Sequence, residues 1–200
     1  MRKQPVVYLV GGDLGRQRDL IATLEATGLH LAIFASADDF VSQYKGREYG
    51  CLVLDWRPGD IACARLLKSL GGSQRHLPII VIIDYGAVTV TVEVVRLGVV
   101  DYLHGPLDRQ ALITKIRAAL ENANMVRASA ARLSVLTPRE REMLQLLIEG
   151  KSSKQIASEK GLSLRTVKNH RTHLLAKTGA ENTADMVRMA MVAGITHITG

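Results

Sequence analysis

The chain has 200 residues, 47% of them hydrophobic and 22% charged, which is the composition of an ordinary globular protein. It contains no apolar run approaching the roughly 18 residues that a membrane span requires, and its N-terminus lacks a signal-peptide pattern. Two cysteines, Cys51 and Cys63, form no metal or disulfide framework. The sequence therefore predicts a cytoplasmic protein with no membrane partner, no cofactor and no metal.

Positive charge is concentrated in the last third of the chain. The formal net charge is +7 and the isoelectric point is about 9.6. Residues 130–200 carry 11 Lys and Arg against 6 Asp and Glu, whereas residues 1–129 carry 15 against 13. This distribution favours a polyanionic partner for the last third, although charge alone does not identify one.

Five short apolar runs, each followed by a helical pattern, make up the first two thirds of the chain. Such continuous runs are typical of strands that helices cover on both faces, so we expect an α/β fold with a doubly wound, five-stranded parallel sheet. The helix over 86–97 should be short or irregular, because it is dense in β-branched residues. Strands are expected at 5–10, 31–34, 51–54, 77–83 and 99–103, and helices at 15–27, 36–45, 60–70, 86–97 and 107–128.

The order and spacing of these segments resemble the receiver domain of bacterial two-component response regulators, a flavodoxin-like fold, over about residues 4–122. LPIIVIIDYGAVTVTVEVVRLGVVDYLHGPL is laid out like the fourth strand through the fifth helix of that family. The resemblance implies two carboxylates that bind Mg²⁺, a phosphoacceptor Asp, a Thr or Ser, and a Lys before Pro. The metal and the Lys offset phosphoryl charge, and the hydroxyl bonds the phosphoryl group.

By this resemblance, Asp55 occupies the phosphoacceptor position, but most of its partners are replaced. Gly11 and Gly12 stand in place of the acidic pair, Ile83 in place of the hydroxyl, and Gly105 in place of the Lys. The resemblance thus implies a degenerate pseudo-receiver in which Asp55 is vestigial.

The same resemblance concerns two further positions. Tyr102 occupies the position of the family's aromatic switch, and Pro106 follows the fifth strand, where the peptide bond is often cis. Three alternatives stay open at this point: an anionic ligand on the glycine-rich segment 10–15, redox sensing through Cys51 or Cys63, and a regulator still phosphorylated at Asp55.

From Leu136 the pattern becomes purely helical. We expect a receiver-like domain over 1–122, a helical linker over 123–135 and a four-helix domain over 136–200. Thr137 is an expected N-cap that forms a capping box with Glu140, and residues 152–177 predict a helix–turn–helix. Ser163 should cap its second helix.

That second helix buries one stripe and presents polar residues on the other side. Together with TPREREML, the Gln-Ile-Ala of the preceding helix and RTVKNH, it resembles the LuxR-type DNA-binding domain, and the whole chain is similar to NarL/FixJ-type response regulators. The resemblance implies base contacts by Lys168, Asn169 and Thr172. It further implies phosphate contacts by Lys154, Arg165, Thr166, His170, Arg171 and Lys177.

Two of these residues have an alternative role, as does the helix itself. Arg171 lies outside the side of the helix that would face the DNA groove, so its alternative role is a salt bridge within the domain. His170 lies at the edge of the buried stripe, so its alternative role is partly structural. The helix taken alone could also be an ordinary solvated amphipathic helix.

The sequence predicts a homodimeric, sequence-specific transcription regulator of double-stranded DNA, not an enzyme, that acts without Mg²⁺-dependent phosphorylation. A partner, a ligand, redox state or abundance would control it. Dimerisation could use the receiver, the linker helix or the last helix. The alternative is an interaction protein whose pseudo-receiver binds a sensor kinase or another regulator.

Overall fold

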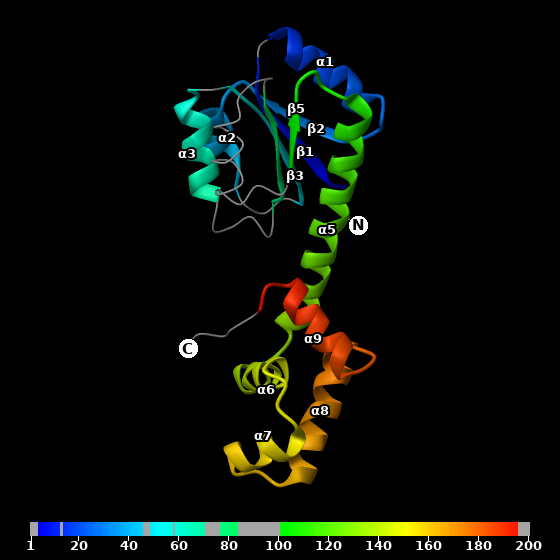
Figure 1. Ribbon diagram of the computed structural model, residues 1–200. Coiled ribbons are helices and arrows are strands. Elements are labelled where there is room, and N and C mark those ends of the chain that lie inside the picture. The colour runs from blue at the N-terminus through cyan, green and yellow to red at the C-terminus, as the bar shows by residue number, and fades with distance from the viewer. Residues whose placement is uncertain are drawn as a thin grey trace. The chain divides into compact units, whose positions relative to one another are not determined.

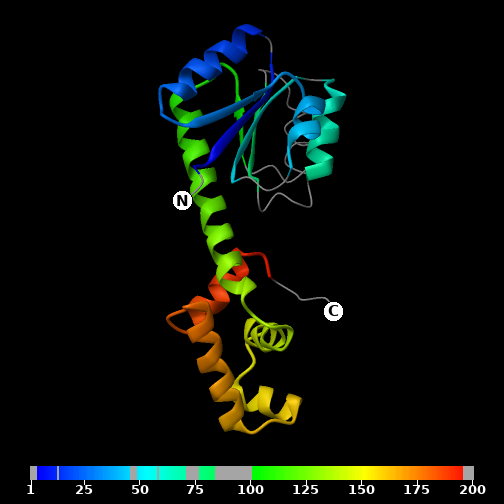
Figure 2. The same cartoon turned by 180° about the vertical axis from the view of Figure 1, so that it is seen from behind.

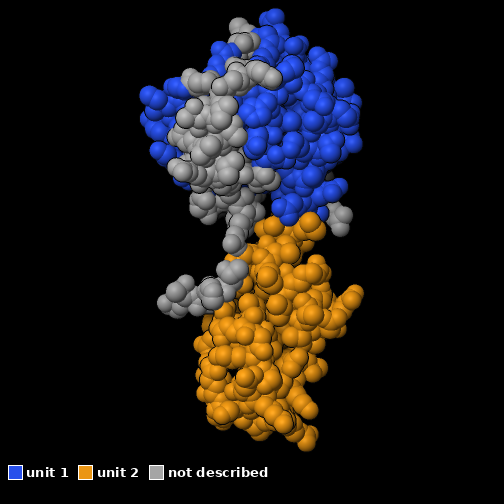
Figure 3. Space-filling model, in the orientation of Figure 1, with its two compact units in different colours: residues 1–124 blue, residues 125–200 orange. Residues whose placement is uncertain are grey.

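A computed structural model describes residues 4–12, 14–45, 49–57, 59–70, 77–83 and 101–195. The expected helix over 86–97 lies outside the described residues, as does Asp13. The contacts within the chain divide it into two compact units, residues 1–124 and 125–200 (Figure 3). This boundary falls inside the segment 123–135, which we expected to be a linker, and each unit is described by itself below.

The first unit is built on a five-stranded sheet in which every described pairing is parallel, with strand order β2-β1-β3-β4-β5. Each of the five apolar runs forms one of these strands, so the predicted fold class is confirmed. The strands are β1 Val6–Gly11, β2 His30–Phe34, β3 Gly50–Trp56, β4 Ile79–Ile83 and β5 Asp101–His104.

Helices cover both faces of the sheet, as Figures 1 and 2 show from opposite sides. Successive side chains of a strand point to opposite faces, so Tyr8 packs with helices α2 and α3 while Leu9 packs with α1 and α5. Both faces need apolar residues, which explains the unbroken hydrophobic runs. The helices are α1 Leu14–Glu25, α2 Ala37–Gln43, α3 Ile61–Leu70 and α5 Arg109–Ser134.

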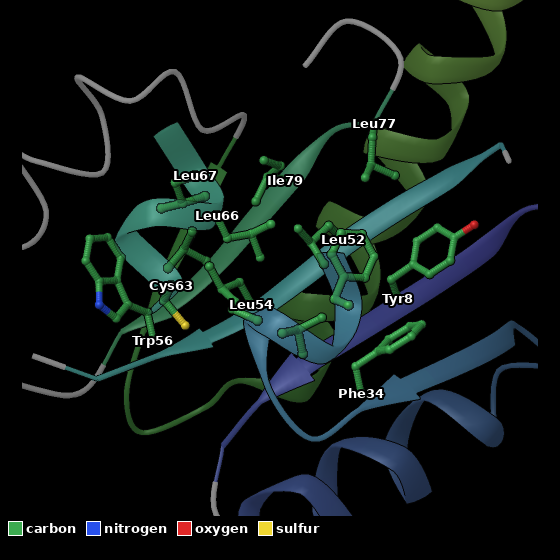
Figure 4. Close-up of a cluster of buried hydrophobic side chains, with 14 of the residues drawn as sticks. Tyr8, Phe34, Leu52, Leu54, Trp56, Cys63, Leu66, Leu67, Leu77 and Ile79 are labelled. Carbon is green, nitrogen blue, oxygen red and sulfur yellow. The ribbon is translucent and has the colours of Figure 1, made fainter. Parts of the chain in front are cut away.

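The buried cluster on the α2 and α3 side contains the aromatic side chains of Tyr8, Phe34, Phe40 and Trp56 (Figure 4). The ring of Phe40 on α2 stacks on Tyr44 with 4.8 Å between centroids and meets Tyr8 edge-on. Ser36 caps α2 by accepting a hydrogen bond from the backbone N–H of Asp39. These contacts hold the segment after β2 close to the carboxyl end of the sheet.

The strand register places the predicted site positions together at the carboxyl-terminal end of the sheet. Gly11 pairs with Asp55, Trp56 with Ile83, and Ile83 with His104, so the carboxyl ends of β1, β3, β4 and β5 are neighbours. The backbone N–H of Gly105 donates to the carbonyl of Ile83 at 2.9 Å. The Gly105–Pro106 peptide bond is cis, as the resemblance implied.

The second unit is helical, with a buried cluster formed by the last turn of α5 and by all four of the following helices. These are α6 Pro138–Ile148, α7 Ser153–Lys160, α8 Leu164–Thr178 and α9 Thr183–Val192. Leu133 of α5 is only 2% exposed within this cluster, so the end of α5 belongs to the core of this unit. The described helices include none that is long and apolar enough to cross a membrane.

Local capping explains where the helices of this unit begin. Thr137 and Glu140 form the predicted capping box at the start of α6. Ser163 caps α8 by accepting a hydrogen bond from the N–H of Thr166 at 3.0 Å. Between α7 and α8, Gly161 adopts a left-handed conformation with φ of 63°, which an L residue rarely adopts and which ends α7 sharply.

Candidate functional site

Helix α8 separates a buried stripe from an exposed polar face. Val167 and Leu174, seven residues apart and so on one side of the helix, are 0% and 1% exposed. Lys168, Asn169 and Thr172 are exposed on the other side. The helix therefore uses its apolar side for the core and exposes the three side chains that were predicted to contact bases, of which the Thr172 hydroxyl also donates to the carbonyl of Lys168 at 3.2 Å.

The basic side chains around α8 fall into two groups. Several are engaged within the unit: Lys151 bonds Glu149 and Glu159, and Lys160 lies 3.7 Å from a carboxylate oxygen of Glu142. These bonds leave less of their charge for an external partner. In contrast, no hydrogen bond or ion pair to a described residue is recorded for the exposed side chains of Lys154, Arg165 and Lys168.

Arg171 joins three helices of the unit. Its Nη1 donates to Ser153 Oγ at 2.7 Å and its Nη2 donates to Thr183 Oγ1 at 2.8 Å, which links the N-terminal ends of α7 and α9 to α8. The residue is half-buried. These contacts favour the scaffold alternative over the predicted phosphate contact, because both ends of the guanidinium fork already have partners.

Lys177 is also held within the unit. Its Nζ donates to Glu140 Oε2 at 2.9 Å, so the last turn of α8 is tied to the capping box of α6. This bond from Lys177, together with the backbone N–H of Thr137, lowers the pKa of Glu140 to about 2. Lys177 therefore has a structural partner that sequence reasoning missed.

Two further predicted phosphate contacts are Thr166 in the first turn of α8 and His170 near the middle of that helix. His170 is exposed and lines, with His173, a cavity of about 560 Å³ formed by residues of α6, α7 and α8. Thr166 is half-buried and its hydroxyl lies 2.8 Å from that of Ser163. Of the two, His170 presents the more accessible side chain.

In the first unit, Asp55 is almost completely buried, at 1% exposure, and is paired with a cation. Arg16 on α1 donates from Nη1 to Asp55 Oδ1 at 3.0 Å. The side chain of Arg16 is 29% exposed, whereas that of Asp55 is fully enclosed. A buried carboxylate requires such compensation, because an isolated charge is costly to remove from water.

Two glycines lie directly against Asp55, Gly12 at its carboxylate and Gly11 at its backbone carbonyl. Gly11 and Gly12 have φ of +82° and +90°, which L side chains rarely adopt. A Cβ on Gly12 would lie 2.6 Å from Asp55 Oδ2, and a Cβ on Gly11 would lie 2.9 Å from the Asp55 carbonyl oxygen. The backbone at the end of β1 can therefore approach Asp55 this closely only because Gly11 and Gly12 lack a side chain.

The other predicted receiver positions lie near this carboxylate in the sheet but add no polar side chain to it. Ile83 is fully buried in the cluster on the α2 and α3 side. Tyr102 is half-buried, and its ring meets His104 edge-on with 5.3 Å between centroids. Gly105 contributes only backbone.

A cavity of about 290 Å³ opens beside Asp55 and also contains Asp60. Mg²⁺ prefers several oxygen ligands in octahedral geometry. Asp55 is bonded to Arg16, and both carboxylate oxygens of Asp60 accept hydrogen bonds from Cys63. Within the described ranges no group of three or more His, Cys, Asp or Glu side chains could hold a metal ion, so the described side chains here do not fit Mg²⁺.

The two thiols are buried and held in the protonated form. Burial raises the pKa of Cys51 to about 12. Burial, with the hydrogen bond to Asp60, raises the pKa of Cys63 well above its ordinary value. Because the thiolate is the reactive species, these environments do not favour redox sensing.

Arg16 was missed by sequence reasoning, although a signal was present. It lies near the start of the helix that follows β1, and helices of a parallel sheet begin at the edge where the strands end. A cation at that position is within reach of a carboxylate at the end of β3.

Comparisons with known proteins agree with this two-part organisation. Residues 9–117 match the family model described as response regulator receiver domain, and residues 134–190 match that of bacterial regulatory proteins of the luxR family. The transcriptional regulatory protein FixJ of Bradyrhizobium diazoefficiens is 32% identical, covering 96% of this chain and 97% of that protein. FixJ of Azorhizobium caulinodans is 34% identical, covering 94% and 93%.

Solved structures include similar two-domain proteins. Full-length FixJ from B. japonicum has a TM-score of 0.56 at 31% identity, covering 98% of this chain and 100% of that one. The response regulator StyR has a TM-score of 0.58 at 30% identity, covering 94% and 99%. With both domain families matched and relatives aligned over nearly the whole chain, this protein belongs to the NarL/FixJ-type response regulators, with a receiver domain followed by a LuxR-type DNA-binding domain.

Proposed function

We propose that this response regulator is a sequence-specific DNA-binding transcription regulator that uses α8 as its recognition helix and acts without Mg²⁺-dependent phosphorylation of Asp55. The observation that carries the first part is the exposed face of Lys168, Asn169 and Thr172 beside cations that have no internal partner. Such side chains suit base edges in a major groove, and the cations suit phosphate.

The phosphate-contacting set is narrower than the sequence resemblance implied. Lys154, Arg165 and Lys168 offer charge that nothing within the described part of the unit neutralises. Arg171 and Lys177 are engaged internally and hold α8 in place. Thr166 and His170 remain proposed phosphate contacts.

The homodimer remains part of the proposal. A C2 dimer would place two recognition helices in successive major grooves, about 10 base pairs apart, on a two-fold related site. Sedimentation of the free protein, and a footprint containing two half-sites at that spacing, would test it. A monomer protecting one half-site would contradict it.

The phosphorylation-independent mechanism is supported by the Arg16–Asp55 pair. The guanidinium supplies a fixed positive charge to Asp55 Oδ1, and Gly12 closes on Oδ2. Phosphorylation would require this enclosed carboxylate to leave Arg16 and attack a phosphoryl donor without the metal that usually offsets its charge. Control of the protein by a sensor kinase is therefore an alternative hypothesis about the signal that regulates it.

DNA selection followed by substitution tests the recognition helix. The protein is first used to select sequences from randomised duplexes, and affinity for the selected site is then measured for Asn169→Ala. We expect a loss of about 5- to 100-fold, which corresponds to one lost base contact, with little change on unrelated DNA. Lys160→Ala is the matched control, because that side chain lies 3.7 Å from Glu142.

Two outcomes would overturn the assignment. Unchanged specific binding by both Asn169→Ala and Lys168→Ala would exclude α8 as the base-reading element. Failure of the wild-type protein to select any sequence, with stoichiometric capture of another regulator or a kinase, would favour the interaction protein instead.

The phosphorylation claim has its own experiment. The protein is incubated with acetyl phosphate and Mg²⁺, and its intact mass is compared with that of Asp55→Ala treated in the same way. We expect no phosphoryl adduct and equal affinity of treated and untreated protein for the selected site. A stable adduct that Asp55→Ala abolishes would contradict the proposal.

A further inference from the structure

The last turn of α5 holds the C-terminal end of α8 through a single arginine. Arg132 Nε donates to the carbonyl oxygen of Thr178 at 2.8 Å, and its Nη2 donates to the carbonyl oxygen of Gly179. These residues are 46 and 47 positions apart in the sequence. The contact is therefore a tertiary one that local helix propensity does not produce.

The carbonyl groups at the end of α8 need such a partner. The last carbonyls of an α-helix have no N–H donors within the helix, and the helix dipole makes this end favourable for a cation. Gly179 ends α8 in a left-handed conformation, with its own N–H bonded to the carbonyl of Leu175. The fork of a guanidinium can bond two carbonyl oxygens at once, which the single ammonium of Lys does with less geometric precision.

The surroundings of this contact are well packed. Leu133, next to Arg132, and Leu174 of α8 are 2% and 1% exposed in the same buried cluster. Thr178 is 2% exposed, and its hydroxyl donates to the carbonyl of Leu174 at 2.7 Å. The end of α5 and the last turn of α8 thus form one packed junction with Arg132 at its edge.

We propose that Arg132 is a positioning residue that fixes the C-terminal end of α8 on α5 and thereby sets the angle at which Lys168, Asn169 and Thr172 meet DNA. The inference rests on the proposed role of α8 in base recognition. Arg132 lies before residue 134, where the match to the luxR family model begins. Arg132 and α8 belong to the same compact unit, residues 125–200.

The first experiment compares affinities of the full chain for selected and unrelated DNA. For Arg132→Gln we expect about 5- to 20-fold weaker binding to the selected site, as for the loss of hydrogen bonds to a charged donor, and a change below about twofold on unrelated DNA. Arg132→Lys should retain part of the affinity. Arg117→Gln is the charge-matched control, since Arg117 is exposed on α5 and has no recorded bond to a described residue.

The ratio of the two affinities separates positioning from direct contact. An equal loss on both DNAs would indicate that Arg132 binds phosphate itself, and the proposal would be wrong. Unchanged binding to the selected site would overturn it as well. A loss restricted to the selected site supports it, because a tilted recognition helix still presents its charge but no longer aligns its base-reading side chains.

Amide hydrogen exchange provides a readout that does not depend on DNA. The N–H groups of Gly179 and Ala180 both donate to the carbonyl of Leu175. In Arg132→Gln these two amides should exchange faster, while the amides of α6 keep their protection. Faster exchange throughout the unit would indicate a general loss of stability, and unchanged exchange at Gly179 and Ala180 would show that Arg132 does not hold this end; either result overturns the proposal.

The two experiments also separate this inference from the proposed function. If the wild-type protein selects no DNA sequence, the proposed function fails on its own. The exchange of Gly179 and Ala180 then still decides whether Arg132 holds the end of α8.

Discussion

Arg16 and Asp55, 39 residues apart, form an ion pair with 3.0 Å between Nη1 and Oδ1, in which the carboxylate is enclosed and the guanidinium reaches partly into solvent. The pair places the positive charge of the Arg16 guanidinium at the end of β3. In a working receiver, by the resemblance described above, a metal ion and a Lys would bring positive charge to this place. In the described structure, Asp55 is paired instead with a side chain of the chain itself.

Because Asp55 is more buried than Arg16, substitutions of the two residues should lower the free energy of unfolding by different amounts. Arg16→Gln should lower the free energy of unfolding by about 1–3 kcal/mol, because an enclosed carboxylate loses its cation. Asp55→Asn should cost less, below about 1 kcal/mol, because the Arg16 side chain, which loses its charged partner, is 29% exposed and its guanidinium can be hydrated. Urea unfolding of the two variants measures the difference, and a larger loss for Asp55→Asn would contradict it.

Gly12 is expected to tolerate no side chain. Gly12→Ala places a Cβ 2.6 Å from Asp55 Oδ2 at a φ of +90°, so it should destabilise the first unit by about 2–4 kcal/mol through contact and backbone strain together. Gly28→Ala is the matched control: its φ is +71° but no atom lies within 4 Å of the added Cβ. It should cost only about 1 kcal/mol, and equal losses at the two sites would contradict a steric role for Asp55.

The free cations of the second unit predict the salt dependence of DNA binding. Each phosphate contact contributes about 0.9 to the slope of log affinity against log salt concentration. Substituting Lys154 or Arg165 by Ala should lower that slope by about 1 and weaken binding to all sequences alike. Lys151→Ala should leave it nearly unchanged, since that ammonium bonds Glu149 and Glu159; a titration from low to moderate salt decides between these outcomes.

Glu140 predicts a pH-dependent contribution to stability. Its pKa is lowered from 4.5 to about 2 in the folded chain, first by the hydrogen bond from Lys177. A lowered carboxyl pKa stabilises the fold above the unfolded value, near 4.5, and this stabilisation is lost as the pH falls toward 2. Glu140→Gln keeps the capping geometry but loses the ion pair, so at pH 7 it should cost about 0.5–1 kcal/mol.

The pH profile of that difference is the measurement. The gap in unfolding free energy between wild type and Glu140→Gln should be largest near neutral pH and shrink steadily below pH 4.5. At pH 7, Glu142→Gln should cost less, because its carboxylate lies 3.7 Å from Lys160 and is 64% exposed. A constant gap across the acid range would refute the assigned role of the Lys177 bond.

Local patterns were sufficient for much of the fold. The apolar runs around Tyr8 and Leu52 predicted buried parallel strands, because side chains on both faces of such a sheet meet covering helices. The caps at Thr137 and Ser163 were also predicted, since a capping bond joins residues three positions apart. The resemblance assigned Gly11 and Asp55 to one site, but the strand order and the register that bring them together come from the structure.

The candidate site was only partly predictable. The exposed face of α8, with Lys168 and Asn169, follows from helical periodicity alone. Periodicity does not tell which cations already have partners, because the partners of Arg171 and Lys177 come from other helices, 12 to 37 residues away.

The sequence by itself determined the two-domain order, the strands, the capped helices and the polar face of α8, because periodicity and caps depend on neighbours within one or two turns. Only the tertiary structure decided that Arg16 neutralises Asp55, that Gly12 closes on the same carboxylate, and that Arg132 holds the end of α8. The physical reason is common to all three. Each depends on whether a side chain or a backbone turn reaches a group that lies far away along the chain. The distance in space between two such groups is set only when the sheet and the helices pack.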